Sequence, residues 1–414
     1  MRARPLCLGL LIWAAIGSPA LVSLHSSPAA AMAQEAVRPE VGKPLAAASN
    51  LMRSGKHREA LAKTREADAV GGKSAYESFV VDRMMGFAAA SAGDAQTASK
   101  ALQSAMDSGK MSGSEKLTAM EALVSAYYRA KDFKGAAAWA DRYTRAGGTN
   151  AQITGLSAQL RYMSGDSAGA ARELSAQVAG DIKAGRKPSE EKLQLLANAY
   201  LNQKNTDGYL ATLEKLVTYY PKPSYWTDVI SRVSRKTGFA DRLALEVYRL
   251  KFATNNMASV EDYMQMAQLA MQEGFNAEGK KVVEKGFAAN VLGQGPQAER
   301  QKRLLDLANK RVATEAATFA QLEKEANASA DGSLLVNLGM SLVGAGQTAK
   351  GIAMMEQGIQ KGGLKRPEDS KLRLGIAYLM AGQKPKAVQM LKTVQGKDGT
   401  ADVARLWTLH AQQH

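Results

Sequence analysis

The stretch GGLKRPEDSKLRLGIAYLMAGQKPKAVQMLKTV, residues 362–394, contains two short apolar segments joined by AGQKP. Gly375 lies three residues before Tyr378 in the first segment, and Ala387 lies four residues before Leu391 in the second. Residues three or four apart share one face of a helix. Gly382 lies between the segments, where a glycine ends a helix because it adopts positive φ at little cost. The stretch therefore predicts a helical hairpin, in which small residues let the two helices approach and large residues fill the space beside them.

This hairpin pattern recurs along the chain. Leu-Gly-x-x-Tyr on a first helix, followed by Ala-x-x-x-Phe on a second helix, is typical of the tetratricopeptide repeat (TPR). We call the position of Ala387 the contact slot and the position five residues earlier the turn slot. Counted back in steps of 34 to 39 residues, the contact slots are Ala387, Gly351, Glu315, Gly279, Leu243, Tyr209, Ala170, Ala136, Ala98 and Ala60. The turn slots are Gly382, Gly346, Lys310, Gly274, Gly238, Lys204, Gly165, Lys131, Gly93 and Gly55. Seven glycines and three lysines in ten turn slots indicate a true internal repeat.

The repeat predicts the fold class. One helical hairpin cannot bury its apolar face alone, so successive hairpins stack on one another. We therefore predict an all-α protein, an α-solenoid of about ten TPR-like hairpins that form a right-handed superhelix. The unit around Glu315 is the weakest, because Lys302 stands where leucine is expected. We interpret it as a degenerate hairpin, although residues 297–328 also fit one long helix.

The N-terminus resembles an export signal. Arg2 and Arg4 precede an apolar run from Leu6 to Ile16, and Ala-Met-Ala at 31–33 fits a cleavage site. We expect a secretory signal peptide at residues 1–33 and a periplasmic mature protein; the alternative is an uncleaved signal that anchors the chain in the inner membrane. The only cysteine, Cys7, precedes the apolar run, which disfavours a lipoprotein and leaves a cleaved chain without disulfides.

The remaining segments are assigned from composition and repeats. Residues 34–46 contain two prolines and are interpreted as a linker. TPR-like repeats are expected at residues 47–222 and 223–398. Residues 399–414, GTADVARLWTLHAQQH, fit a C-terminal cap helix that covers the last hairpin with its apolar face.

The sequence offers no chemistry for catalysis. Its four histidines show no paired metal-ligand spacing, and no nucleophile elbow, phosphate loop or dinucleotide fingerprint is present. We therefore predict no catalytic residues, no metal, no cofactor and no enzymatic activity. The formal charge is +15, but lysine and arginine are interleaved with acidic residues and accompany no nucleic-acid motif. This distribution indicates solvated helix faces, or else an acidic partner or an anionic membrane surface.

Helix-hairpin solenoids bind partners mainly on the concave face, which the first helix of each repeat lines. Counting from the leucine of the repeat gives the side chains expected on that face. Amide, guanidinium and aromatic groups among them could hold the backbone of an extended peptide. The partner-binding candidates are Arg83, Phe87, Tyr128, Arg129, Asn198, Asn202, Arg232, Arg235 and Lys236. The alternative for each is an ordinary solvated helix residue.

The segment TYYPKPSYW, residues 218–226, groups four aromatic rings around two prolines. We interpret it as a joint between two repeats that is filled by rings, because aromatic side chains are the largest available fillers. The alternative is an aromatic binding ridge.

Two passages resemble a known family. Tyr-Pro-x-x-x-Tyr-Trp occurs at Tyr220 to Trp226, and Gly-Gly-Leu-Lys-Arg-Pro occurs at Gly362 to Pro367. They are similar to the secreted TPR proteins that accompany TonB-type energy-transduction systems in Gram-negative bacteria. The resemblance covers the C-terminal half of the chain, and the N-terminal half matches only as generic repeats. It implies a periplasmic accessory that contacts TonB, ExbB or ExbD and supports outer-membrane uptake, and it supplies no contact residues.

Two other functions remain open from the sequence. One is a scaffold for cell-envelope assembly or polysaccharide export, whose loss would disturb the envelope barrier and leave uptake normal. The other is an enzyme, which would require a nucleophile or a metal site that the sequence does not display.

Overall fold

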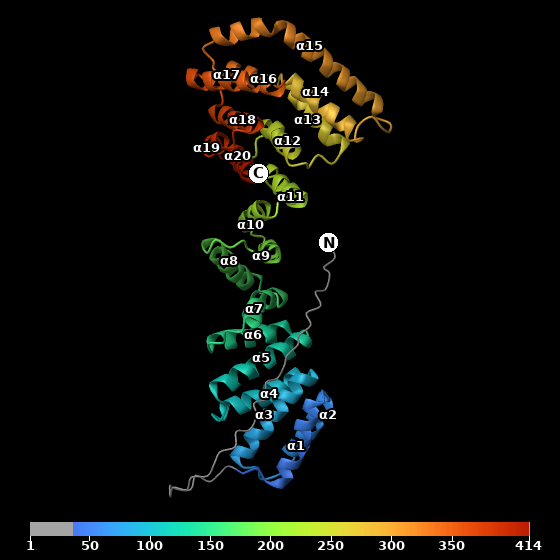
Figure 1. Cartoon of the computed structure of the whole chain (residues 1–414), viewed down its shortest axis with the longest axis vertical. Coiled ribbons are helices and arrows are strands. Elements are labelled where there is room, and N and C mark those ends of the chain that lie inside the picture. Colours follow the sequence, from blue (N-terminus) through green and yellow to red (C-terminus); the bar gives the residue numbers. More distant parts are fainter. Residues whose placement is uncertain (1–35, 414) are drawn as a thin grey trace. The chain divides into compact units, whose positions relative to one another are not determined.

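The computed structural model describes residues 36–413 and contains only helices in that range (Figure 1). The expected signal peptide at residues 1–33 lies outside the described residues. The chain divides into two compact units, residues 1–122 and 123–414, within helix α5. The boundary expected at 222/223 does not separate compact units. Unit 1 contains α1 (Pro39–Arg53), α2 (His57–Asp68), α3 (Ala75–Ala92), α4 (Ala95–Asp107) and the first part of α5 (Gly113–Arg129).

Unit 2 continues the succession of hairpins from the end of α5. Its helices are α6 (Phe133–Arg145), α7 (Ala151–Met163), α8 (Ser167–Lys183), α9 (Glu190–Asn202), α10 (Thr206–Tyr219), α11 (Pro223–Ser234), the short 3-10 helix η1 (Asp241–Leu243), α12 (Ala244–Ala253), α13 (Val260–Gln272), α14 (Asn276–Ala288), α15 (Ala298–Ala328), α16 (Ser333–Gly344), α17 (Thr348–Lys361), α18 (Pro367–Met380), α19 (Lys384–Leu391) and α20 (Thr400–Gln412). The all-α solenoid class is confirmed.

The turn slots explain where the hairpins fold back. All seven glycines of the turn slots adopt positive φ, for example Gly382 at 72° and Gly93 at 87°. Lys131 and Lys204 also adopt positive φ, 58° and 57°. Nine of the ten turn slots therefore lie where the repeat register placed them. The tenth, Lys310, lies inside a continuous helix.

The segment expected as a linker at residues 34–46 is largely helical, and that prediction was wrong. Helix α1 begins at Pro39, where proline fits because the first turn has no intrahelical acceptor for its missing N–H. Val41 and Leu45 are buried in a cluster with Val81. The Arg38 guanidinium donates to Glu77, with Nε 2.8 Å from Oε1. These contacts anchor the segment to the first hairpins.

The degenerate hairpin expected around Glu315 is one helix, α15, which runs from Ala298 to Ala328. In the first part of α15, Leu304 and Ala308 are buried, and in its last turn Ala326 is buried. No residue between 309 and 325 is buried. The hairpin does not form because its contact slot holds a glutamate, which cannot enter an apolar helix interface without losing hydration.

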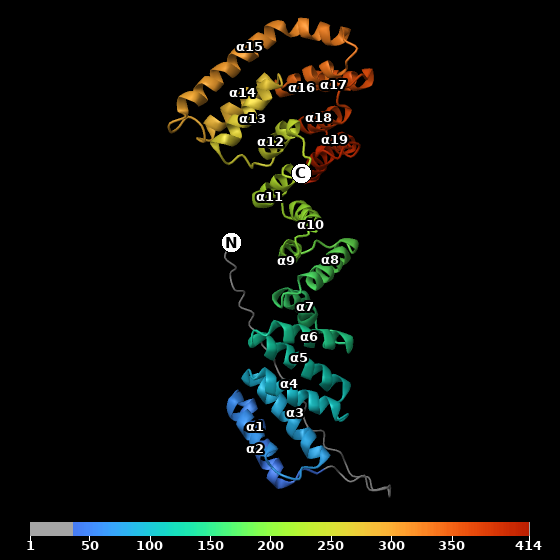
Figure 2. The same ribbon diagram turned by 180° about the vertical axis from the view of Figure 1, so that it is seen from behind.

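The C-terminal helix does more than cover the last hairpin. Helix α20 packs on α18 and α19 and also returns to α10, α11 and α12 (Figures 1 and 2). The Trp407 indole donates to the Glu246 carbonyl at 3.4 Å, and Gln413 Nε2 donates to the Val217 carbonyl at 2.8 Å. Arg405 pairs with Glu214 at 2.8 Å. The helices from α10 to α20 therefore form a closed circuit rather than an open stack with a cap.

Buried charges support this circuit. The Arg249 guanidinium is 3% exposed and bonds both Glu246 and Glu278, with Nε 2.8 Å from Oε1 of Glu278. Arg373, from α18, donates to Glu246 at 2.9 Å. Burial by itself would raise the pKa of Glu246, but the positive charges of Arg249 and Arg373 lower it. The ion pairs of Arg249 with Glu246 and Glu278, and of Arg373 with Glu246, join α12, α14 and α18.

Candidate partner-binding surface

Helix α9 presents the most open of the predicted binding positions. Ser189 caps its N-terminus by accepting from the Lys192 N–H at 3.2 Å, and Leu193 and Leu196 bury its inner face. Asn198 is exposed on the outer face, and within residues 36–413 its side chain forms no hydrogen bond. Asn202 is also exposed and lies 3.4 Å from the Ser167 hydroxyl. Both amides are available to a partner's backbone.

The predicted basic cluster on α11 separates into different environments. Arg232 donates to Asp228 at 2.8 Å, and its guanidinium lies 4.2 Å from the centre of the Tyr209 ring. Tyr209 donates to the same carboxylate at 2.5 Å, and burial followed by this hydrogen bond raises the pKa of Tyr209 to about 12. Lys236 pairs with Asp402 of α20 at 3.0 Å. Arg235 is exposed and has no ion pair within the described residues. Of the three cations, Arg235 is the one open to a partner.

The remaining candidates lie on α3 and α5. In unit 1, Arg83 pairs with Glu115 at 2.8 Å, and Phe87 is half-buried. In unit 2, Tyr128 meets Phe133 edge-on, with ring centres 5.8 Å apart, and Arg129 is exposed. The Tyr128 ring thus packs against Phe133 and remains partly exposed to solvent.

Large apolar side chains are exposed at matching places in three consecutive hairpins. Tyr128, Met163 and Leu201 lie in the last turn of α5, α7 and α9, and they are 36%, 39% and 45% exposed. Tyr128 and Leu201 both lie eight residues before their contact slots, and Met163 lies seven before its own. Tyr128 and Leu201 are therefore equivalent positions of stacked repeats, and Met163 lies one residue further along in the same helical turn. We name these three residues the apolar row. The row is flanked by the predicted candidates Arg129 and Asn202.

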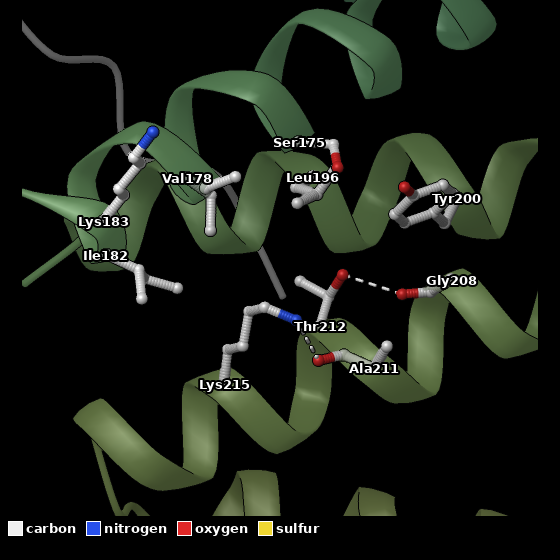
Figure 3. A pocket seen from close by; sticks show the side chains of 11 residues that line it. Ser175, Val178, Ile182, Lys183, Leu196, Tyr200, Gly208, Ala211, Thr212 and Lys215 are labelled. Atoms are coloured by element: carbon white, nitrogen blue, oxygen red, sulfur yellow. Dashed lines mark hydrogen bonds between the residues drawn. The ribbon is translucent and has the colours of Figure 1, made fainter.

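A groove opens between α8 and α10, on the second helices of two hairpins (Figure 3). It has a volume of about 470 Å³, with Leu196 and Tyr200 of α9 at its base and Val178 and Ile182 of α8 on one wall. Thr212 donates to the Gly208 carbonyl at 2.8 Å and Lys215 donates to the Ala211 carbonyl at 3.2 Å, both on the α10 wall. No His, Cys, Asp or Glu lines it. The groove offers mainly apolar contact, with Lys183, Lys215 and the Tyr200 hydroxyl as polar groups in its lining.

Sequence reasoning missed this groove and Met163. The groove results from small residues, Ala179 and Ala211, on the facing walls of α8 and α10. The one residue in the sequence that could have indicated the groove was Ile182, because it is an apolar residue near the end of a predicted helix, next to Lys183. Comparison of residues at the same distance from each contact slot would not have found Met163, because the position equivalent to Tyr128 and Leu201 in that repeat is Tyr162.

The predicted aromatic joint can be located in the structure. Trp226 is buried and meets the His410 ring edge-on, with centres 6.1 Å apart. Tyr220 donates to the Pro188 carbonyl at 2.9 Å, and Tyr225 bonds Glu190. The rings connect α9, α11 and α20, so the structure favours the joint over the binding ridge.

Residues 36–413 contain no group of three or more His, Cys, Asp or Glu side chains placed to hold a metal ion. In the same range, no helix is both long and apolar enough to cross a membrane.

Comparisons with known families agree with the repeat architecture. Residues 84–261 match a family described as outer membrane lipoprotein, YfiO, and residues 369–398 match a tetratricopeptide repeat family. The second match covers most of α18 and α19, the hairpin with which the sequence analysis began. None of the curated proteins matches the chain.

Among solved structures, the TPR2AB-domain:pHSP90 complex of yeast Sti1 is 14% identical, with 72% of this chain and 98% of that chain covered and a TM-score of 0.23. The TPR domain of P58(IPK) is 12% identical, with 90% and 97% covered and a TM-score of 0.21. Naa15/Naa10 bound to HypK-THB is 15% identical, with 86% and 57% covered and a TM-score of 0.28. The repeat register, the hairpins and the matched families identify the chain as a TPR-type α-solenoid whose residues 84–261 are similar to outer membrane lipoproteins.

Proposed function

We propose that this protein is a non-catalytic scaffold that binds other proteins in the cell envelope. The observation that carries the proposal is the apolar row of Tyr128, Met163 and Leu201, which are exposed in the last turns of α5, α7 and α9. Exposed aromatic and apolar side chains with polar neighbours are typical of the central contacts of protein interfaces. Asn198 and Asn202 on the first helix α9, and Arg235 directly after α11, add hydrogen-bond donors.

The partners proposed are TonB, ExbB or ExbD, and the protein then acts as an accessory of a TonB-type system that supports outer-membrane uptake. The sequence resemblance at residues 220–226 and 362–367 supports this assignment. The similarity of residues 84–261 to outer membrane lipoproteins supports a location in the envelope. A periplasmic mature chain, released by cleavage after residue 33, fits both.

A second candidate is a scaffold for envelope assembly or polysaccharide export. The same similarity to outer membrane lipoproteins favours it, because it concerns the envelope and not energy transduction. The two candidates differ in the proteins that the apolar row contacts.

The test is photo-crosslinking in living cells with a photoreactive residue placed at Leu201 of the full-length protein. The matched control carries the same residue at Leu307, which is comparably exposed but lies on α15, outside the apolar row and both grooves. Capture of TonB, ExbB or ExbD at position 201 and not at 307 is the expected result.

Capture of assembly or export proteins at position 201 would support the second candidate and overturn the first. Equal capture at both positions would mean that the apolar row is not a specific surface. Deletion of the gene separates the candidates independently, since loss of iron-complex uptake follows from the first and a leaky barrier follows from the second.

A further inference from the structure

A second groove lies beside α15, far along the sequence from the apolar row. Its walls are the second half of α15 and helix α16, and the turn between α13 and α14 closes one end. Its volume is about 390 Å³. From Arg311 to Ala326, α15 lines the groove over about 22 Å, or roughly four helical turns. We name it the α15 groove.

The α15 groove exists because one hairpin is missing. The chain continues through the turn slot Lys310 as a helix, so no second helix folds back onto α15. Helix α14 instead contacts α16 directly, and the buried residues of α15 lie near its two ends, while its middle is held by polar contacts such as those of Glu315 with Asn276 and Ser341. The groove therefore has the length and the open side that a further helix would fill.

Two leucines are left partly uncovered in the groove. Leu322 on α15 and Leu334 on α16 line it and are 39% and 43% exposed. Ala326 and Leu338, which are more buried, lie beside them in the same lining. Two apolar side chains from facing walls, with an apolar base, make a seat for the apolar face of an amphipathic helix.

The charges of the groove are opposite to those of the chain. Its lining contains Glu273, Glu315, Glu325 and Arg311, but Glu273 pairs with Arg373 of α18, so the other three groups give 1 − 2 = −1. The whole chain carries +15. Within residues 36–413, neither Glu315 nor Glu325 has an ion pair: Glu315 accepts from Asn276 at 2.9 Å and Glu325 accepts from Gln321 at 2.6 Å. Two carboxylates thus remain without a cation beside exposed leucines.

We propose that the α15 groove binds a basic amphipathic helix of a partner protein. The apolar side chains of that helix contact Leu322 and Leu334, and its lysines or arginines pair with Glu315 and Glu325. This site is separate from the apolar row and does not depend on the function proposed for it. The scaffold then has a second binding site, which prefers a basic partner, whereas its basic surface prefers an acidic one.

The test uses synthetic helical peptides of about 16 residues, long enough to fill the groove. One peptide has leucines at i, i+3, i+4 and i+7 with lysine at the other positions, and its counterpart has glutamate in place of lysine. Fluorescence anisotropy measures the binding of each labelled peptide to the full protein at low and at physiological salt. The lysine peptide is expected to bind, and the glutamate peptide is not.

Four variants locate the binding. Leu334→Lys and Glu325→Lys are each expected to weaken the lysine peptide by about tenfold or more. Leu307→Lys and Glu299→Lys are the matched controls, because both residues are exposed on α15, lie outside the groove and produce the same changes of charge. The controls are expected to bind as the unaltered protein does. Leu334→Ala, which adds no charge, should weaken binding less than Leu334→Lys.

Three results would overturn the proposal. They are equal binding of the two peptides, equal losses in the groove variants and their controls, or no binding of the lysine peptide at low salt. Sedimentation of the protein alone adds a fourth. A concentration-dependent dimer that Leu334→Lys abolishes and Leu307→Lys preserves would mean that a second copy of this chain occupies the groove.

Discussion

Helices α18 and α19 and helix α15 share one repeat register but fold differently. In the first region the chain ends a helix at Met380, turns at Gly382 and begins a second helix at Lys384. Ala387 in its contact slot is fully buried. In the second region the helix continues through Lys310 and Glu315.

The turn residue does not account for this difference. Lys131 and Lys204 occupy turn slots and adopt positive φ, so lysine at this place is compatible with a hairpin. The contact slots differ more: alanine or glycine can be buried there, while a glutamate must keep water or a hydrogen bond. Glu315 keeps hydrogen bonds from Asn276 and Ser341 at the rim of the groove. The comparison indicates that the residue in the contact slot, which is buried in a regular hairpin, decides whether the hairpin forms.

The largest effect is expected from placing a glutamate in a regular contact slot. Ala387→Glu should lower the free energy of unfolding by about 4 kcal/mol, because it inserts a larger, charged group at a fully buried position. Urea unfolding followed by circular dichroism measures it. Gln389→Glu, two residues further on the exposed side of α19, is the control and should change stability little. A loss below about 1 kcal/mol for Ala387→Glu would contradict the role given to the contact slot.

A smaller effect is expected from adding one methyl group to a glycine contact slot. A Cβ at Gly351 would overlap the Gly339 carbonyl oxygen and lie 2.8 Å from a methyl of Val343. Gly351→Ala should therefore cost about 2–3 kcal/mol in thermal or urea unfolding, since a backbone atom cannot move aside. Gly180→Ala in α8 is the control: nothing lies within 4 Å of its added Cβ, so it should stabilise the helix by up to about 1 kcal/mol. Equal signs for the two variants would refute the close approach of α16 and α17.

The two kinds of turn slot should respond to glycine with opposite signs. Lys204→Gly should raise the free energy of unfolding by about 1 kcal/mol, because glycine adopts positive φ without strain. Lys310→Gly should lower it by about the same amount, because glycine is unfavourable inside a helix. Both lysines are exposed, so changes in packing do not confuse the comparison. A stabilising Lys310→Gly would mean that the chain turns there in solution.

The smallest effect is expected when the glutamate of α15 is removed. Glu315→Ala loses the hydrogen bonds from Asn276 and Ser341 but gains helix propensity, so the free energy of unfolding should stay within about 1 kcal/mol. Comparison with Ala387→Glu then shows how differently the contact slot contributes to the free energy of unfolding in α19 and in α15. A loss of several kcal/mol would mean that Glu315 holds α15 in place.

Local sequence was enough to predict most of the fold. Nine of ten turn slots are recognisable because a turn between helices needs a residue that tolerates positive φ, and a regular period repeats that need. The sequence left one long helix over residues 297–328 as the alternative to a degenerate hairpin, because Lys302 stands where leucine is expected. Helix α1 was missed because two prolines look like a linker, yet one of them is well placed in a first turn.

The surface was harder to predict than the fold. The repeat placed Asn198 and Arg235 on exposed first-helix positions, since exposure follows the helical period. It could not show that Lys236 pairs with Asp402, because the two are 166 residues apart and meet only when α20 returns to α11. The α15 groove was equally hidden, since it results from a hairpin that fails to close.

The return of α20 to α10, α11 and α12 also limits how this protein can evolve. An open stack of repeats can gain or lose a unit by gene duplication, because each unit contacts only its neighbours. A hairpin added between α12 and α18 would move α20 away from the residues that it must reach, Glu214 and Lys236 among them. The number of repeats within the closed circuit should therefore be fixed among descendants of this gene, while the hairpins before α10 remain free to vary in number.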